Sequence, residues 1–218
     1  MKNNLTKFSK KVHCAGVMSF DFGSDPIYKE FSDFIDKINV LVPAKVYDYA
    51  SLDGKVDQDV RICHHYKDIE DLTSKYPEIE RFAFHFHKMM ELTSWEYMEE
   101  HKMTNLDAFD FLEVLKYTPG GKYEPHVDQY TGDREVSCII YLNDVEKGGE
   151  TYFPKTYNKK GQPIKIKPKA GRVLLFLCGH SSLHAGLPVK KGYKTVIYTF
   201  LCQESSNEGM RESLYDFR

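Results

Sequence analysis

Apolar residues recur at helical spacing in two stretches of the first half of the chain. In residues 25–38 and again in 77–101, apolar side chains are three or four positions apart, which predicts one buried face on each helix. They are Ile27, Phe31, Phe34, Ile35 and Ile38 in the first stretch and Phe82, Phe86, Met89, Met90 and Leu92 in the second. Asp25 stands at the capping position, and Pro26 and Pro77 stand where helices begin.

The pattern changes from about Phe109 onward. Short apolar runs, rich in β-branched and aromatic residues, are separated by Gly, Pro, Asn and Lys: FLEVLKY, VSCIIYL, TYFP, IKIKP, RVLLFLC and TVIYTFL. Short strands after a helical opening predict an α+β protein that is mainly β, an antiparallel sandwich or barrel with supporting helices. We expect one domain over residues 1–218, with a helix-rich support region at 1–108, a core at 109–202 and a polar tail at 203–218.

Composition narrows the class of protein without naming a function. The chain has 218 residues, 41% hydrophobic and 28% charged, as in an ordinary globular protein. A net charge of −2 gives no reason to expect nucleic acid or an anionic membrane as a partner. Five scattered cysteines without a C-x-x-C favour a reducing compartment. Because no apolar run resembles a signal peptide or a membrane span, we expect a cytoplasmic location.

His126 and Asp128, in YEPHVD, are a candidate metal-binding pair. Side chains at i and i+2 share a side of a strand but not of a helix, so the pair can chelate one ion only on extended chain. The local sequence favours extended chain, because residues 118–121 (TPGG) form a predicted turn and Pro125 excludes a helix interior. An isolated H-x-D is nevertheless more often two surface residues than a metal site.

A third ligand would turn this pair into a functional centre. Two histidines and one carboxylate on one coordination face suit Fe(II) and leave positions open. Downstream of the pair, the candidates for the second histidine are His180 and His184, both in CGHSSLHAG. Spacing alone leaves both of them open.

Four motifs, in order, resemble a known enzyme family. YTPGGKYEPHVD, YLNDVEKGGETYFP, KPKAGRVLLFL and HAGLPVKKGYKTVIYTF are similar to the core of the Fe(II)/2-oxoglutarate-dependent dioxygenases, and most similar to the prolyl 4-hydroxylase branch. The resemblance covers roughly residues 110–202. It implies a double-stranded β-helix, a jelly-roll barrel of the cupin kind, with supporting N-terminal helices.

The resemblance also implies roles for individual residues. His126, Asp128 and His184 would be the iron ligands. Lys194, ten positions after His184, would hold the distal carboxylate of 2-oxoglutarate, and Tyr141, Tyr117 and Thr151 would line the same pocket. In YKTVIYTF, Lys194 alternates with Val196, Tyr198 and Phe200, so these four share one strand face. A lysine buried there would need an anionic partner.

The activity implied by the resemblance is hydroxylation of a C–H bond, with Fe(II), 2-oxoglutarate and O2 as cofactor and cosubstrates and L-ascorbate as reductant. A prolyl residue in a peptide or protein is the first choice of substrate, and a free amino acid or another small molecule is the alternative. An alternative hypothesis from another functional class is a cupin-like metal-binding protein without oxygenase activity. The set Lys194, Tyr141 and Tyr117 argues against it, because a plain metal barrel needs no dicarboxylate pocket.

Four further histidines have no assigned chemistry. His85 and His87 fall within the second predicted helix, where they would point apart, so we expect places at the edge of the core or on the surface. His64 and His65 precede that helix, in a part of the chain that approaches the substrate in relatives, which leaves a role near the substrate open.

Overall fold

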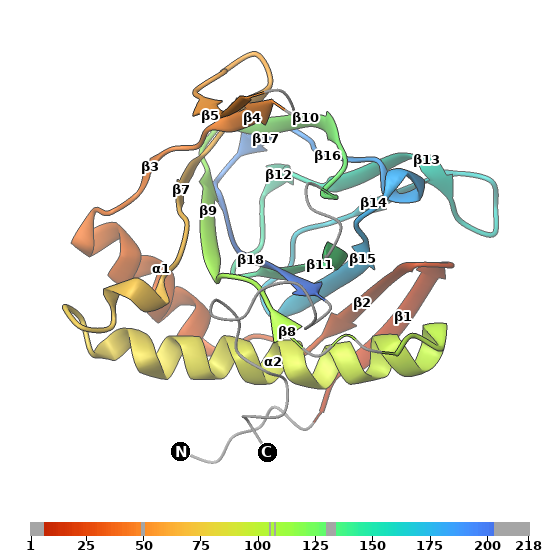
Figure 1. The fold of residues 1–218 in the computed structure, drawn as a ribbon, viewed down its shortest axis with the longest axis horizontal. Helices are drawn as coiled ribbons and strands as arrows, with labels where there is room; N and C mark the ends of the chain where they lie inside the picture. Colours follow the sequence, from red (N-terminus) through yellow and green to blue (C-terminus); the bar gives the residue numbers. More distant parts are fainter. Residues whose placement is uncertain (1–6, 49–50, 105, 107, 130–133, 203–218) are drawn as a thin grey trace.

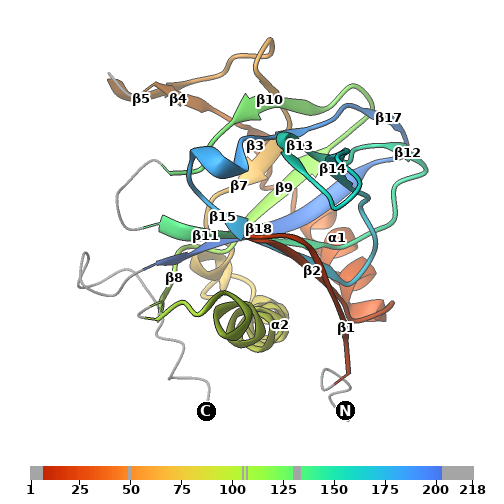
Figure 2. The ribbon, with the colours of Figure 1, turned by 90° about the vertical axis from the view of Figure 1, so that its right-hand side faces the viewer.

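Two facing β-sheets with helices on one outer side make up the computed structural model, which describes residues 7–48, 51–104, 106, 108–129 and 134–202. Figure 2 shows the layers: the helix α2 (Glu78–His101), seen end-on, lies beneath the larger sheet, and the smaller sheet lies on its other side. All strand pairs are antiparallel. The larger sheet is therefore the middle layer of the molecule.

The larger sheet has nine strands among the described residues. Their order is β1 (Ser9–Cys14), β2 (Val17–Asp21), β15 (Arg172–Leu177), β11 (Arg134–Tyr141), β18 (Lys194–Cys202), β9 (Glu113–Tyr117), β7 (His64–Tyr66) and β3 (Val42–Pro43), and β8 (Ala108–Phe109) also pairs with β18. Its central strands are buried on both faces. This is why their sequences are continuous apolar runs and do not alternate with polar residues.

The smaller sheet carries much of the functional region. Its five strands are β14 (Pro163–Ile166), β13 (Thr151–Tyr157), β16 (His184–Gly186), β10 (Lys122–His126) and β6 (Arg61–Ile62), in that order. Two further pairs join β12 (Lys147–Gly148) to β17 (Val189–Lys191) and β4 (Val46–Asp48) to β5 (Ser51–Lys55). Figure 1 shows the strands closing around an interior, with β10, β13 and β16 opposite β11 and β18. One cluster of buried side chains, among them Leu115, Phe153 and Phe176, fills the space between the sheets.

The helices cover the outer face of the larger sheet. In α1 (Pro26–Ile38) the Asp25 carboxylate accepts a hydrogen bond from the Ile27 amide, as the capping position predicts. Phe31 of α1 packs edge-on against Phe82 and Phe86 of α2. The Tyr97 hydroxyl of α2 donates to the Gly16 carbonyl between β1 and β2. These contacts place the apolar faces of both helices in one large cluster with the sheet.

The structure confirms the predicted helices and the runs predicted as strands after residue 109. The description of residues 1–108 as helix-rich was incomplete, because α1 and α2 are accompanied there by the strands β1 to β7 and a short 3-10 helix, η1 (Glu70–Leu72). β1 escaped detection because its sequence, SKKVHC, is polar and its side chains are largely exposed. The predicted polar tail, 203–218, lies outside the described residues. Among the helices of the described residues, none has the length and apolar character needed to cross a membrane.

Candidate metal and cosubstrate site

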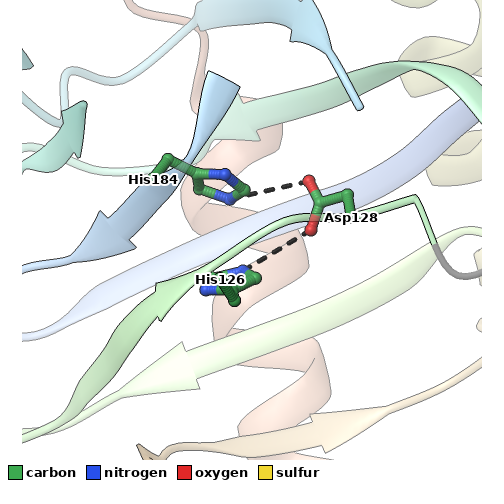
Figure 3. Close-up of side chains that lie close together, drawn as sticks. All are labelled: His126, Asp128 and His184. Atoms are coloured by element: carbon green, nitrogen blue, oxygen red, sulfur yellow. Dashed lines mark ion pairs between the residues drawn. The ribbon is translucent and has the colours of Figure 1, made fainter. Parts of the chain in front are cut away.

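Three predicted metal ligands come together between the sheets. His126 ends β10 and His184 begins β16, and the two residues are direct partners in the antiparallel pair of these strands. Asp128 follows β10 by two residues, and its carboxylate points between the two imidazoles (Figure 3). One ligand atom from each of the three residues lies within 4.8 Å of the others. Strand register therefore brings together a pair that is local in sequence and a histidine that is distant.

Backbone carbonyls hold both imidazoles in the form that can bind a metal. Nδ1 of His126 lies 2.8 Å from the Glu124 carbonyl oxygen, and Nδ1 of His184 lies 3.1 Å from that of Ser182. A carbonyl only accepts, so each Nδ1 carries the proton and donates it. The opposite nitrogen, Nε2, then presents its lone pair, and each Nε2 is 3.5 Å from an Asp128 oxygen. Such outer hydrogen bonds are typical of metal-binding histidines.

Asp128 is held as a buried carboxylate. Burial by itself would raise its pKa, but the neighbouring His184 and His126 and a hydrogen bond from Ser137 outweigh burial and lower the pKa well below its usual range. The Ser137 hydroxyl of β11 donates to Oδ2 at 2.6 Å and lies 3.2 Å from the Cys178 sulfur. The Asp128 amide donates to the Cys178 carbonyl. The larger sheet thus fixes the position and the charge of this ligand.

His184 is neutral at physiological pH. Burial lowers its pKa to about 4, although the Asp128 carboxylate acts in the opposite direction. A neutral imidazole has a lone pair to give to a metal, so no proton needs to be displaced before binding. Two histidine nitrogens and one carboxylate oxygen on one side form the donor set that suits Fe(II) and leaves further positions open. The residues present fit such an ion.

Beside the three ligands lies a cavity of about 360 Å³. Lys194, at the start of β18, is 3% exposed and faces this cavity. Its ammonium donates to the Gly149 carbonyl at 3.1 Å and lies 4.1 Å from the centre of the Tyr117 ring. Burial lowers its pKa to about 8, against smaller opposite effects of Cys63 and Glu150. Among the described residues this is a buried cation with hydrogen-bonding capacity to spare, as an anion-binding position requires.

The predicted face of β18 is confirmed, because Lys194, Val196, Tyr198 and Phe200 all line the cavity. The position of the Gly149 carbonyl depends on its neighbour, Gly148. Gly148 has φ +80°, and a Cβ there would lie 2.2 Å from the Pro188 carbonyl oxygen. Only glycine fits this backbone.

Tyr141, Thr151 and Tyr117 line the same cavity as Lys194. The Tyr141 hydroxyl, at the end of β11, is hydrogen-bonded to that of Thr151, at the start of β13, at 2.6 Å. Tyr117, at the end of β9, is the register partner of Lys194. Burial raises the pKa of both tyrosines, so both phenols keep their protons and can donate them in hydrogen bonds. The four residues predicted for a cosubstrate pocket are therefore gathered in one place.

The other histidines take different places. His180 is exposed in the short 3-10 helix η2 (His180–Ser182), away from the three-residue cluster. His85 and His87 are buried in the core, and His87 contacts Glu70 at 3.1 Å. The prediction that these two could lie on the surface was wrong, because the buried residues of α2 occupy more than one face of the helix.

His65 lines the cavity and is hydrogen-bonded to Glu113, whereas His64 is exposed. Sequence reasoning missed Arg61, Glu113 and Tyr123, which line the cavity with His65. They come from β6, β9 and β10, and no local spacing in the sequence predicts that these three residues lie close together.

A family comparison agrees with this geometry. Residues 112–202 match the 2OG-Fe(II) oxygenase superfamily. The matched segment contains all three ligand candidates and the four residues of the cosubstrate pocket. It leaves the helices α1 and α2 outside.

Plant enzymes are among the similar sequences. The chain is 38% identical over 118 residues to probable prolyl 4-hydroxylase 3 of Arabidopsis thaliana, over 40% of each chain. It is 31% identical over 136 residues to prolyl 4-hydroxylase 2 of the same plant, over 48% of this chain and 43% of the relative. The chain thus spans about two fifths of the length of the curated relatives that it matches.

Solved structures share the fold over most of the chain. A Trichoplax adhaerens prolyl hydroxylase, in complex with a peptide of hypoxia inducible factor, is 17% identical, with a TM-score of 0.65 over 89% of this chain and 88% of that one. The viral collagen prolyl hydroxylase of Paramecium bursaria Chlorella virus-1, in its 2OG complex, is 22% identical, with a TM-score of 0.58 over 92% and 99%. The fold is the double-stranded β-helix of these proteins. Residues 112–202 match the 2OG-Fe(II) oxygenase superfamily, and the chain is similar in sequence to prolyl 4-hydroxylases.

Proposed function

We propose that this chain is an Fe(II)- and 2-oxoglutarate-dependent dioxygenase that hydroxylates a prolyl residue of a peptide or protein, with succinate and carbon dioxide as coproducts. One observation carries the proposal: two imidazoles and a carboxylate converge beside a cavity that also holds a buried lysine. A barrel that only bound a metal would have no need for this second, anion-binding feature. The similarity to prolyl 4-hydroxylases supports the same activity.

His126, Asp128 and His184 would hold the iron through their Nε2 and carboxylate atoms. Bound Fe(II), with 2-oxoglutarate and O2, supplies the oxidising power for C–H hydroxylation, and L-ascorbate is the reductant typical of such enzymes. The hydrogen bonds from Ser137 to Asp128 and from the histidines to backbone carbonyls keep the ligands aligned before the ion arrives. The carboxylate also offsets one of the two charges of the ion.

Lys194 would bind the distal carboxylate of 2-oxoglutarate. A carboxylate there would satisfy the remaining donors of the ammonium and would restore its pKa upward, because an adjacent anion favours the charged form. The neutral phenols of Tyr141 and Tyr117 and the Thr151 hydroxyl would donate or accept the remaining hydrogen bonds. Buried apolar side chains around them, such as Phe153 and Phe176, keep water from this end of the cavity.

A prolyl residue is our first choice of substrate because the similar sequences and structures are prolyl hydroxylases, one of them with a bound peptide. A free amino acid or another small molecule is the alternative within the same chemistry. We further propose that residues 1–218 act as one domain, since α1 and α2 pack on the sheet that lines the cavity. The five cysteines are free, which supports a reducing compartment such as the cytoplasm.

A turnover assay tests the proposed function. The purified chain is given Fe(II), 2-oxoglutarate, ascorbate and proline-containing peptides, and succinate is measured beside the peptide mass. We expect slow succinate release without peptide, faster release with it, and one added oxygen atom on proline. Parallel reactions with alanine in place of proline identify the oxidised residue. Metal-loaded protein that releases no succinate with any peptide would overturn the oxygenase proposal in favour of a metal-binding module.

A further inference from the structure

Besides Lys194, the cavity has a second group of cationic residues that the proposed chemistry does not use. Lys45, Arg61 and Lys67, here called the basic rim, line the cavity from the N-terminal half of the chain. Both lysines are exposed, so the rim lies where the cavity opens. All three residues precede the segment that matches the oxygenase family. The rim therefore lies outside the matched segment, in the N-terminal half of the chain.

Arg61 is the buried member of the rim, and neighbouring groups hold its side chain in place. Its side chain is only 10% exposed, and its buried Nε has no hydrogen-bond partner among the described residues. One terminal nitrogen donates to the Lys45 carbonyl at 3.3 Å, and the Tyr123 ring lies 4.8 Å from the guanidinium carbon. The Cys63 thiol is a further neighbour. A guanidinium held this deeply with a donor unused is poised to bind an acceptor from a ligand.

The carboxylate nearest to Arg61 is already engaged. Glu113 lies 3.8 Å from an Arg61 terminal nitrogen, beyond hydrogen-bond distance, and its Oε1 is 2.5 Å from Nδ1 of His65. His65 therefore draws Glu113 away from a direct bond with the arginine. Arg61 therefore has an ion pair with Glu113 at 3.8 Å but no hydrogen bond to it, and a carboxylate from outside can supply that bond.

The charge balance of the lining favours an anionic ligand. Five cations, Lys45, Arg61, Lys67, Arg134 and Lys194, and two carboxylates, Glu113 and Asp128, line the cavity among the described residues. Arg134 is paired with Asp110, and Lys194 and Asp128 serve the proposed cosubstrate and metal. The rim is then left with three cations and the engaged Glu113. Lys67 also lines a neighbouring cavity, which it shares with Asp68 and Asp71. Arg61 and Lys45 do not line that cavity.

We propose that the basic rim binds an acidic side chain of the substrate, so that the chain selects prolyl residues that have a glutamate or aspartate close by in the peptide. Arg61 makes the direct contact, and Lys45 and Lys67 raise the local concentration of the acidic segment. This inference rests on the proposed function only in taking the substrate to be a peptide. The binding step itself requires no turnover.

Synthetic peptides test the proposal by direct binding. Labelled peptides, blocked at both ends, carry one proline and a single Glu moved through the positions on either side of it, and each has a partner with Gln. Anisotropy is measured with the whole chain, Fe(II) and 2-oxoglutarate without oxygen. At one or more positions we expect the Glu peptide to bind roughly tenfold more tightly than its Gln partner, with an advantage that shrinks as salt rises. Equal affinities of all Glu and Gln partners would overturn the proposal.

Variants locate the contact. Lys45→Gln and Lys67→Gln are exposed substitutions, and together they should reduce the Glu preference about two- to fivefold. Arg61→Gln should abolish it and Arg61→Lys should keep part of it, with thermal melting used to verify the fold. The pair Lys159→Gln and Lys160→Gln removes the same charge from the exposed β13–β14 turn and should leave the preference intact. A preference unchanged in both the lysine pair and a folded Arg61→Gln variant would show that the rim is not the binding site.

Two further measurements distinguish recognition of an acidic side chain from recognition of any carboxylate. A peptide whose only carboxylate is its free C-terminus, and free glutamate as a competitor, reveal whether any carboxylate suffices or a side chain is needed. Binding of Glu peptides without succinate release would contradict the proposed function and leave this inference standing. Equal hydroxylation of Glu and Gln peptides, with equal affinity, would support the proposed function and contradict this inference.

Discussion

Two groups of residues that line the cavity come from different halves of the chain. Lys194, Tyr141, Thr151 and Tyr117 all lie within residues 112–202, the segment that matches the oxygenase family, whereas the basic rim comes from residues 45–67. The first group, here called the cosubstrate pocket, is buried, and strand register fixes the pairing of Lys194 with Tyr117. The two lysines of the rim are exposed, and the rim is assembled from β6, the residue after β7 and the segment before β4. The two proposals thus assign the chemistry to the barrel strands and substrate selection to the N-terminal half.

The largest effect is expected at the proposed metal ligands. His184→Ala removes one of three donors and should lower both iron affinity and succinate production by more than about 100-fold, because even outer-shell changes cost 10- to 100-fold. His180→Ala, four positions away and exposed, is the matched control and should be nearly silent. Iron content and turnover measure both variants. Loss of iron in His180→Ala with retention in His184→Ala would reverse the ligand assignment.

Lys194→Met should come next in size. The variant keeps the length of the side chain but loses the charge, so we expect the KM for 2-oxoglutarate to rise by about 10- to 100-fold, the worth of a charge-assisted hydrogen bond. Lys165→Met, exposed on β14, removes a lysine from the same barrel without reaching the cavity. Steady-state kinetics with saturating peptide make the comparison. An unchanged KM in Lys194→Met would mean that another cation binds the cosubstrate.

Ser137→Ala tests how the larger sheet supports the ligands. The variant removes the 2.6 Å hydrogen bond to Asp128 without touching the other two ligands. We expect iron affinity to fall by about tenfold, with little change in the KM for 2-oxoglutarate. Ser19→Ala, another buried serine of the same sheet, serves as the control. If iron affinity is equal in the two variants, Ser137 is only a packing residue.

The pH dependence of cosubstrate binding should be smaller and graded. The proposed binding of a carboxylate by Lys194 requires its charged form, which predominates below its pKa of about 8. As the pH rises from 8 to 9, the charged fraction of the free enzyme falls, so the KM for 2-oxoglutarate should increase by several-fold. Below pH 8 the KM should level off. The same profile in Lys194→Met would show that the titrating group is a different one.

The residues of the cosubstrate pocket could be predicted from the sequence, whereas those of the rim could not. Two of the signals are local: the i, i+2 pair at 126 and 128 and the alternation along β18. Patterns between near neighbours can be recognised in the sequence itself. The choice of His184 over His180 required the resemblance to a family, because the two histidines are only four positions apart in the sequence. Arg61, His65 and Glu113 meet only through pairing of β6 with β10 and of β7 with β9. Such contacts between distant strands leave no periodic signal, and the polar edge strand β1 left none either.

The smallest effect is expected where the N-terminal half only supports the barrel. Tyr97→Phe removes the hydrogen bond from α2 to the Gly16 carbonyl, which still accepts from the Leu177 amide. The expected loss is about 1 kcal/mol of unfolding free energy, or roughly 2–4 °C in Tm. The KM values for peptide and 2-oxoglutarate should be unchanged, because Tyr97 lies on the far side of the sheet from the cavity. Tyr157→Phe, exposed on β13, should change neither. Altered kinetics in Tyr97→Phe would contradict a purely supporting role for α2 and would extend the functional part of the N-terminal half beyond the rim.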